Sequence, residues 1–433
     1  MNRRDFLNAA ALSGLSFASA AAVTEIRAEP RPDPPAGPPV SVGVIGLGEQ
    51  GRAILSSLAK LGPSKAPVAA ICDSYVAPIL ERRAKEFAPN SVMSNDYRKL
   101  LDDKNVQAVF VATPSHKHKQ IVLDALQAGK HVYCEAPLAT DLDEAKAIAR
   151  AGMDAKTFLM PGLQVRSNAQ ALHVGHFVKA RDFGTIIQGR AHWHRRNSWR
   201  LTHPDAAREK ELNWRLSKET SSGLIGEVGI HQIDTATMYI ATLPVSVTGF
   251  GAIVEYKDGR DVPDSAQCIL EFPKGVTFYY DASLVSSFEN QGNIGYEVFY
   301  ANGGTFLMRD QRAWMFKEPD ANNLGWEGFA RRDVLQVGDP GNGTGEKIGA
   351  GIALVADASK QIALGKDPGK IGTDVSKTSL YQAVEAFVSA ASLNKRPAVG
   401  PKEGYQATVI AHRCHEAALN KSRIEFHDDM FAM

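Results

Sequence analysis

Short apolar runs alternate with amphipathic stretches over residues 41–160. The run Val42–Ile45 precedes a stretch in which apolar side chains recur at helical spacing, up to Leu61. Further apolar runs cover residues 68–72, 106–112 and 132–134. Strands that are apolar on both faces are typical of a parallel sheet covered by helices on each side. The pattern predicts an N-terminal α/β domain with a doubly wound parallel sheet.

Residues 161–433 show a different pattern, in which several strand-like runs follow one another. These runs cover residues 186–194, 245–254, 267–272, 276–281 and 296–300. Helical patterns return near 376–393 and 404–420. We therefore predict a second α/β domain over residues 161–433, whose last helices pack back on the first domain.

The first forty residues have the pattern of an export signal followed by a stiff linker. Residues 2–7 read Asn-Arg-Arg-Asp-Phe-Leu, an apolar stretch follows, and Ala18-Ser19-Ala20 offers a cleavage site. The alternative is a basic start to an ordinary helix. We interpret residues 1–28 as a twin-arginine signal peptide and expect export, for instance to the periplasm. Six prolines in residues 29–40 predict an extended Pro-rich arm.

Composition and charge exclude several classes of partner. The 433 residues are enough for two domains, and 49 basic side chains nearly cancel 48 acidic ones. This balance favours neither nucleic acid nor an anionic membrane surface. The N-terminal apolar stretch is too short and too rich in alanine to predict a membrane span. The four cysteines lack metal-ligand spacing, and nothing argues for a disulfide.

A glycine motif stands at the end of the first predicted strand. Residues 46–51 read Gly-Leu-Gly-Glu-Gln-Gly, the G-x-G-x-x-G pattern in the strand-to-helix context that it requires. Gly46 permits a tight turn, Gly48 lets a pyrophosphate approach, and Gly51 lets the helix pack closely on the strand. We therefore predict that the residues that bind a dinucleotide include Gly46, Leu47, Gly48, Glu49, Gln50 and Gly51.

An acid at the end of the second strand favours NAD. Asp73 lies 22 residues past Gly51, where a carboxylate can bind both ribose hydroxyls and repel a 2′-phosphate. Arg82 and Arg83 keep NADP possible, and an ordinary loop acid is the alternative for Asp73. At the end of the 106–112 strand, Thr113, Pro114 and His116 are further candidate cofactor residues, as is Glu135 after the 132–134 strand.

The combination of motifs resembles the Gfo/Idh/MocA oxidoreductase superfamily, the glucose–fructose oxidoreductase and inositol dehydrogenase group. The motifs are the glycine loop, Asp96-Tyr97, the segments 111–116 and 128–135, and Gly229-Ile230-His231-Gln232-Ile233-Asp234, which matches G-x-H-x-x-D. The resemblance implies that the C-terminal domain carries a large, mostly antiparallel open sheet. It also implies a homo-oligomer, either a dimer or a tetramer.

One residue departs from the superfamily pattern. Members usually carry Glu-Lys-Pro at the end of this strand, where the lysine donates to the reacting sugar oxygen. This chain has Glu135-Ala136-Pro137 instead. Alanine can neither move a proton nor stabilise an oxyanion. The dehydrogenase set is therefore incomplete, or another residue supplies the missing group.

The candidate catalytic residues are His231, Glu135 and Asp234. His231 and Asp234 are three residues apart and share one helix face. Imidazole titrates near neutrality, so we predict that His231 is the base, with Glu135 nearby. A histidine that is only structural, bonded to Asp234, is the alternative. We expect Asp234 to orient the site or to bind sugar hydroxyls.

Aromatic and polar residues around the second domain suggest a sugar-sized pocket. Tryptophan faces stack on sugar rings, and arginine or glutamine binds hydroxyls. The candidate substrate residues, besides His231, are Gln164, Arg166, Trp193, Trp214 and Arg215. Core tryptophan and surface arginine explain each of them equally well. His192 and His194 share a strand face, but no third ligand completes a site, so we predict no metal.

Three functions compete. The first is a nicotinamide-dependent oxidoreductase that transfers hydride to or from a sugar carbinol carbon on a non-dissociable NAD, because an exported enzyme must restore its cofactor in place. The second is a redox-neutral glycosidase or lyase, which oxidises, eliminates, hydrates and re-reduces. Members resembling NAD-dependent α-N-acetylgalactosaminidases also keep the glutamate and lack the lysine. The third is an inactive periplasmic protein that binds a sugar or NAD.

Overall fold

The computed structural model describes residues 37–433 except for 76, 287–294, 310, 323, 325–326, 328–329 and 338–345. The predicted signal segment and most of the Pro-rich arm, residues 1–36, therefore lie outside the described residues, as does part of the C-terminal domain. None of the helices in the described ranges combines the length and the apolar character that a bilayer crossing requires.

The N-terminal sheet has six parallel strands in the order β3-β2-β1-β4-β5-β6. The strands are β1 (Val42–Ile45), β2 (Val68–Cys72), β3 (Val92–Ser94), β4 (Ala108–Val111), β5 (His131–Cys134) and β6 (Leu159–Pro161). The order reverses next to β1, which creates the crevice where dinucleotides bind in such sheets. The predicted doubly wound parallel sheet is confirmed.

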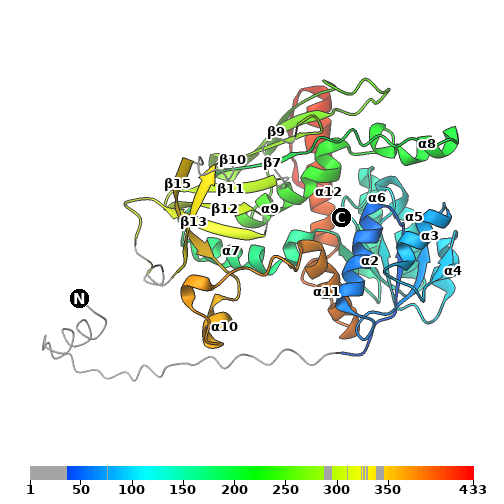
Figure 1. Ribbon diagram of the computed structural model, residues 1–433. Coiled ribbons are helices and arrows are strands. Elements are labelled where there is room, and N and C mark those ends of the chain that lie inside the picture. Colours follow the sequence, from blue (N-terminus) through cyan, green and yellow to red (C-terminus); the bar gives the residue numbers. More distant parts are fainter. Residues whose placement is uncertain are drawn as a thin grey trace, which may run out of the picture. The chain divides into compact units, whose positions relative to one another are not determined.

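Helices cover both faces of this sheet, as its apolar strands require. The helices are α2 (Glu49–Leu61), α3 (Pro78–Lys85), α4 (Tyr97–Asp102), α5 (His118–Gln127) and α6 (Leu142–Asp154), with the short 3₁₀ turn η1 (Ser115–Lys117). α2 and α3 pack on one face together with the late helix α11 (Ser379–Ser392). α4, α5 and α6 pack on the other face, together with α12 (Pro401–Asn420). Two helices from the end of the chain thus complete the N-terminal layers (Figure 1).

The second sheet has ten strands in the order β14-β15-β13-β12-β11-β7-β10-β9-β8-β16. Only the described pair β7 and β10 runs parallel, so the predicted mostly antiparallel sheet is confirmed. The strands are β7 (Ile186–His194), β8 (Ser246–Ala252), β9 (Ser265–Phe272), β10 (Val276–Ser283), β11 (Gly295–Ala301), β12 (Gly304–Arg309), β13 (Arg312–Lys317), β14 (Arg332–Val337), β15 (Glu346–Leu354) and β16 (Arg423–Glu425).

One face of this large sheet forms the main core of the C-terminal half. Its side chains pack against α7 (Ala169–Ala180), α9 (Ile230–Ile240) and α12. The remaining helical pieces are the turn η2 (Gln164–Ser167), α8 (Ala206–Leu212), the turn η3 (Trp214–Leu216), the π-helix η4 (Ile225–Gly229), α10 (Ala358–Ala363), and the turns η5 (Pro273–Gly275), η8 (Pro368–Lys370) and η9 (Asp428–Phe431). Because α12 contributes to both cores, the two halves are joined by a shared helix.

Candidate active site

The glycine loop between β1 and α2 has the geometry of a dinucleotide cradle. Gly46 has φ +93°, and a Cβ there would lie 2.5 Å from the carbonyl oxygen of Ala112. A Cβ on Gly51 would lie only 1.8 Å from the carbonyl oxygen of Gly46, whereas a Cβ on Gly48 would meet nothing within 4 Å. Each glycine therefore has the distinct role that the motif assigns to it: turn, open approach and close packing.

The groups around this loop fit the pyrophosphate and ribose of a dinucleotide. Gly48 caps α2 without any side-chain hydrogen bond, so the helix N-terminus is free to bind phosphate. Asp73 accepts from the backbone N–H of Leu47 at 2.9 Å and from that of Tyr75 at 2.9 Å. These bonds hold its carboxylate beside the loop. The hydroxyl of Thr113 is buried without a hydrogen-bond partner among the described residues, which leaves it available to a ligand.

The other predicted cofactor residues differ in how deeply their side chains are buried and in their partners. Glu49 is exposed in the first turn of α2, and the Leu47 side chain is buried in the core. Pro114 is half-buried. The Nδ1 of His116 donates to the carbonyl of Thr220 at 3.1 Å. The hydrogen bond between His116 and Thr220 therefore joins the two halves of the sequence at the carboxyl end of β4.

Glu135 links the glycine loop to the end of β5. Its Oε1 accepts from Nε2 of Gln50 at 2.9 Å, and Gly162 packs so closely that a Cβ there would lie 2.6 Å from Oε2. Burial raises the pKa of Glu135 to about 7, against the opposing effect of hydrogen bonds from Gln50 and Gln164. A carboxyl that is half-protonated near neutrality is suited to general acid–base work.

Ala136 lies in an apolar setting beside the helix that carries His231. Its side chain packs against a buried cluster made of Leu163, Ile230, Val399, Ala407 and Ala411. Ile230 directly precedes His231 and begins α9. The position where the resemblance expects a lysine is thus close to the predicted base and lacks a polar group.

His231 is half-buried at the start of α9, and burial lowers the pKa of its imidazole to about 4. The ring is therefore neutral near pH 7 and has a free lone pair, but it is a weaker base than an ordinary imidazole, so the near-neutral titration expected from the sequence is not found. The alternative in which His231 is bonded to Asp234 does not occur. Instead, Asp234 accepts two hydrogen bonds from Arg166, from Nε and from Nη2, both at 2.8 Å.

The Arg166–Asp234 pair ties the turn after β6 to α9. The Asp234 side chain is 3% exposed and that of Arg166 is 19% exposed. Burial raises the pKa of Asp234, opposed by the hydrogen bonds and charge of Arg166. Because both carboxylate oxygens bind Arg166, Asp234 serves to hold this arginine in place, and Arg166 keeps its remaining N–H groups for other partners.

Sequence reasoning missed a second buried acid, Glu227. Its Oε2 accepts from the Ser115 hydroxyl at 2.9 Å, and its Oε1 accepts from the Ser222 N–H at 3.1 Å. Burial raises its pKa, opposed first by the charge of Arg215. Glu227 lies in the π-helix η4, four residues before His231. That spacing, which places two side chains on one face of a helix, was the signal that could have revealed it.

The predicted tryptophans separate into two groups. Trp214 lies near the cofactor side, with its ring centroid 6.0 Å from that of His116, and the Arg215 guanidinium lies 4.4 Å above the Trp214 ring. Trp193 instead packs with Trp199 against the C-terminal core, with centroids 6.5 Å apart. The contacts of Trp193 therefore place it in the C-terminal core, whereas Trp214 contacts His116 of the N-terminal domain.

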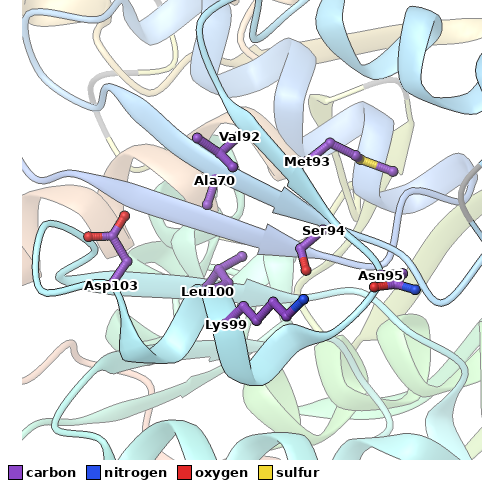
Figure 2. A pocket seen from close by; sticks show the side chains of 8 residues that line it. All are labelled: Ala70, Val92, Met93, Ser94, Asn95, Lys99, Leu100 and Asp103. Atoms are coloured by element: carbon purple, nitrogen blue, oxygen red, sulfur yellow. The ribbon is translucent and has the colours of Figure 1, made fainter.

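A surface depression of about 450 Å³ lies beside β3 and α4 (Figure 2). It is lined by Ala70, Val92, Met93, Ser94, Asn95, Lys99, Leu100 and Asp103. None of the predicted site residues is among them. The geometry of the glycine loop, and not this depression, locates the cofactor. Within the described ranges, no group of three or more His, Cys, Asp or Glu side chains is arranged to hold a metal ion.

Comparison with known proteins agrees with this geometry. Residues 40–163 match the family described as "Oxidoreductase family, NAD-binding Rossmann fold", and residues 172–305 match "GFO/IDH/MocA C-terminal domain". Levoglucosan dehydrogenase of Pseudarthrobacter phenanthrenivorans is 25% identical, over 89% of this chain and 98% of that protein. Glycosyl hydrolase family 109 protein 1 of a Shewanella species is 28% identical, over 41% of this chain and 39% of that protein.

A solved structure of levoglucosan dehydrogenase, in complex with NADH and levoglucosan, has the same fold. Its TM-score is 0.67 at 19% sequence identity, and the match covers 90% of this chain and 99% of that one. The two domain arrangements therefore correspond over nearly the whole described chain.

Proposed function

The chain belongs to the GFO/IDH/MocA oxidoreductase family and has an NAD-binding Rossmann domain, and we propose that it transfers hydride between a sugar carbinol carbon and a tightly held NAD. The observation that carries this proposal is the buried carboxyl of Glu135, which accepts a hydrogen bond from Gln50 at the glycine loop and is followed by Ala136, whose side chain packs against the cluster that contains Ile230, the residue before His231. Similarity to levoglucosan dehydrogenase supports a sugar-like substrate.

The residues of the chain would share the work as follows. NAD, when bound, supplies the hydride acceptor; the glycine loop, Asp73 and Thr113 would hold it. His231 takes the proton of the sugar hydroxyl as the carbon loses hydride. Glu135, joined to Gln50, receives or returns a proton near neutral pH. Arg166, fixed by Asp234, binds sugar oxygens, and Gln164 adds an amide donor.

A redox-neutral glycosidase is the second candidate, favoured by one specific observation. Ala136 places a methyl group in an apolar cluster where family dehydrogenases carry the lysine. Transient oxidation acidifies the C–H next to the new ketone, elimination expels the aglycone, water adds, and hydride returns to the sugar. The partial similarity to a glycosyl hydrolase family 109 protein supports this route.

One experiment separates the two routes. The purified protein is mixed with a panel of free sugars and glycosides, and the absorbance of reduced nicotinamide is recorded together with aglycone release. A single rise to about one reduced cofactor per chain, without aglycone, supports the dehydrogenase. Many turnovers of aglycone release without a lasting rise support the glycosidase. If no sugar or glycoside that binds gives either signal, both proposed reactions are refuted.

The export signal and the oligomer stay proposals as well. We propose that residues 1–28 direct the chain through the twin-arginine route, on the strength of the Arg3-Arg4 motif and the apolar run that follows. Replacing both arginines by lysine should retain the protein in the cytoplasm on cell fractionation. We propose a homo-oligomer by analogy with the family, to be tested by light scattering.

A further inference from the structure

A segment of the C-terminal domain reaches across to the cofactor side of the Rossmann domain. This bridging segment, residues 195–221, follows β7 and contains α8 and η3. In Figure 1, α8 is drawn above the N-terminal helices, and its Arg208 contacts Tyr75 of the N-terminal domain. The segment contacts two loops of the N-terminal sheet, one after β2 and one after β4. In the strand order β2-β1-β4, these two loops flank the glycine loop.

The contact after β2 is made through Tyr75. The Cζ of Arg208 lies 4.3 Å from the centroid of the Tyr75 ring, and the Tyr75 hydroxyl lies 3.1 Å from Nε2 of His203. Nδ1 of His203 lies 3.0 Å from the backbone nitrogen of Asp205, which fixes the ring beside Tyr75. Tyr75 is two residues past Asp73 and binds its carboxylate through the backbone. The segment therefore reaches the ribose-binding acid through one intermediate residue.

The contact after β4 is made through His116. Its Nδ1 donates to the Thr220 carbonyl, and its ring lies 6.0 Å from that of Trp214. Thr220 in turn donates to the Trp214 carbonyl at 2.7 Å. The middle of the bridging segment and its C-terminal end are thus fixed to opposite sides of the crevice that would hold the dinucleotide.

Hydrogen bonds from Arg260 and Asp261 of the C-terminal domain also hold the bridging segment in place. Arg260, which is 7% exposed, donates from Nη2 to the Ser198 carbonyl at 2.6 Å. The N–H of Asp261 donates to the Leu216 carbonyl, and its carboxylate accepts from the Lys218 N–H at 2.7 Å. Moving the segment away from the crevice would break these bonds as well as those to Tyr75 and His116.

We propose that this segment is a clasp that retains NAD, with Tyr75, His203 and Arg208 as the residues that hold it over the adenosine half of the cofactor. The inference rests on the proposed function, because it explains how an enzyme of this kind keeps one dinucleotide through many turnovers. Release of NAD then requires the clasp to open. The residues of the clasp therefore control the rate of NAD release and leave the rate of hydride transfer unchanged.

The test measures release of NADH from the full-length protein. Wild type and variants are loaded with NADH, freed of excess by gel filtration, and mixed with a large excess of NAD while the nicotinamide fluorescence is followed. Arg208→Ala should release NADH roughly threefold faster, since a threefold change corresponds to about 0.7 kcal/mol, within the range of a cation–π contact on an exposed ring such as that of Tyr75. Tyr75→Phe, which loses only the bond to His203, should release it roughly threefold faster.

Lys210→Ala is the matched control, because Lys210 is an exposed base on the same helix. It should release NADH at the wild-type rate. Equal rates for wild type, Arg208→Ala and Tyr75→Phe would overturn the clasp and leave the proposed chemistry standing. If both variants release NADH faster but no sugar reduces the NAD bound to the protein, the clasp is supported and the proposed chemistry is refuted.

Discussion

The two sides of the candidate active site are built from different parts of the chain. The cofactor side is mostly backbone: three glycines, a helix N-terminus and an acid lie within one stretch from Gly46 to Asp73. The candidate substrate side is made of side chains that follow β5 or lie in η2 and α9, which are up to about a hundred residues apart. A local site can be recognised from sequence, whereas a site assembled from distant segments needs the fold.

The glycine loop gives the sharpest contrast within the cofactor side. Gly51→Ala places a Cβ 1.8 Å from the Gly46 carbonyl oxygen, and we expect it to destabilise the protein by about 3 kcal/mol or more and to abolish NADH binding. Gly48→Ala has open space and an ordinary φ of −61°, so it should keep its stability and lose only affinity. Urea unfolding and NADH titration measure both. Comparable stability losses would show that the two glycines do not differ as described.

His231→Ala tests the substrate side. We expect the rate of sugar oxidation to fall by about 10²- to 10⁴-fold, because a positioned base contributes that much, with NADH affinity unchanged. His173→Ala, which removes another half-buried histidine on α7, is the control and should keep full activity. An active His231→Ala protein would remove His231 from its assigned role.

Removing one partner of the buried Arg166–Asp234 pair should cost more stability than replacing both partners by apolar residues. Arg166→Ala leaves the Asp234 carboxylate, 3% exposed, without its partner, and we expect a loss of about 3 kcal/mol in unfolding free energy. The double variant Arg166→Met with Asp234→Leu should recover most of this loss but not the activity. Equal destabilisation in both proteins would mean that the pair does not act through its charges.

Glu135 should make the stability of the protein depend on pH. Between its ordinary pKa of 4.5 and its folded pKa of about 7, the folded state keeps the proton and the unfolded state does not. The stability due to Glu135 therefore falls as pH rises through this window, by at most about 1.4 kcal/mol per pH unit, and is constant above it.

Replacing the carboxyl isolates this effect. Glu135→Gln should gain stability relative to wild type as pH rises from about 4.5 to about 7, measured by urea unfolding at several pH values. Glu49→Gln, at an exposed position of α2, should follow the wild-type curve. A Glu135→Gln curve parallel to wild type would show that Glu135 ionises normally in the folded protein.

The fold and the cofactor side could be predicted because their signals are local. Apolar runs and the glycine spacing led to the parallel sheet and to NAD. Several strands of the second sheet, from β12 to β15, were not predicted. β12, β13 and β14 have six residues each, which is too short for a clear periodicity, and Gly349 and Gly351 interrupt the apolar pattern of β15. Helix boundaries differed by a few residues, as for α11 and α12.

The candidate substrate residues were proposed one by one from the sequence, and their connections came only from the structure. That Asp234 binds Arg166, and not His231, depends on where η2 lies against α9. Glu227 gave no signal beyond its spacing to His231, because its partner Ser115 lies in the other domain. Side-chain pairing across domains is set by the packing, which no local pattern contains.

The central claim, that a sugar carbon gives hydride to the resident NAD, can be measured with a deuterated sugar. The protein, loaded with NAD, is mixed with a reactive sugar deuterated at its ring carbons and quenched within the first turnover, and the extracted dinucleotide is weighed by mass spectrometry. We predict reduced dinucleotide carrying one deuterium. Conversion of the sugar with no deuterium in the dinucleotide would contradict the account.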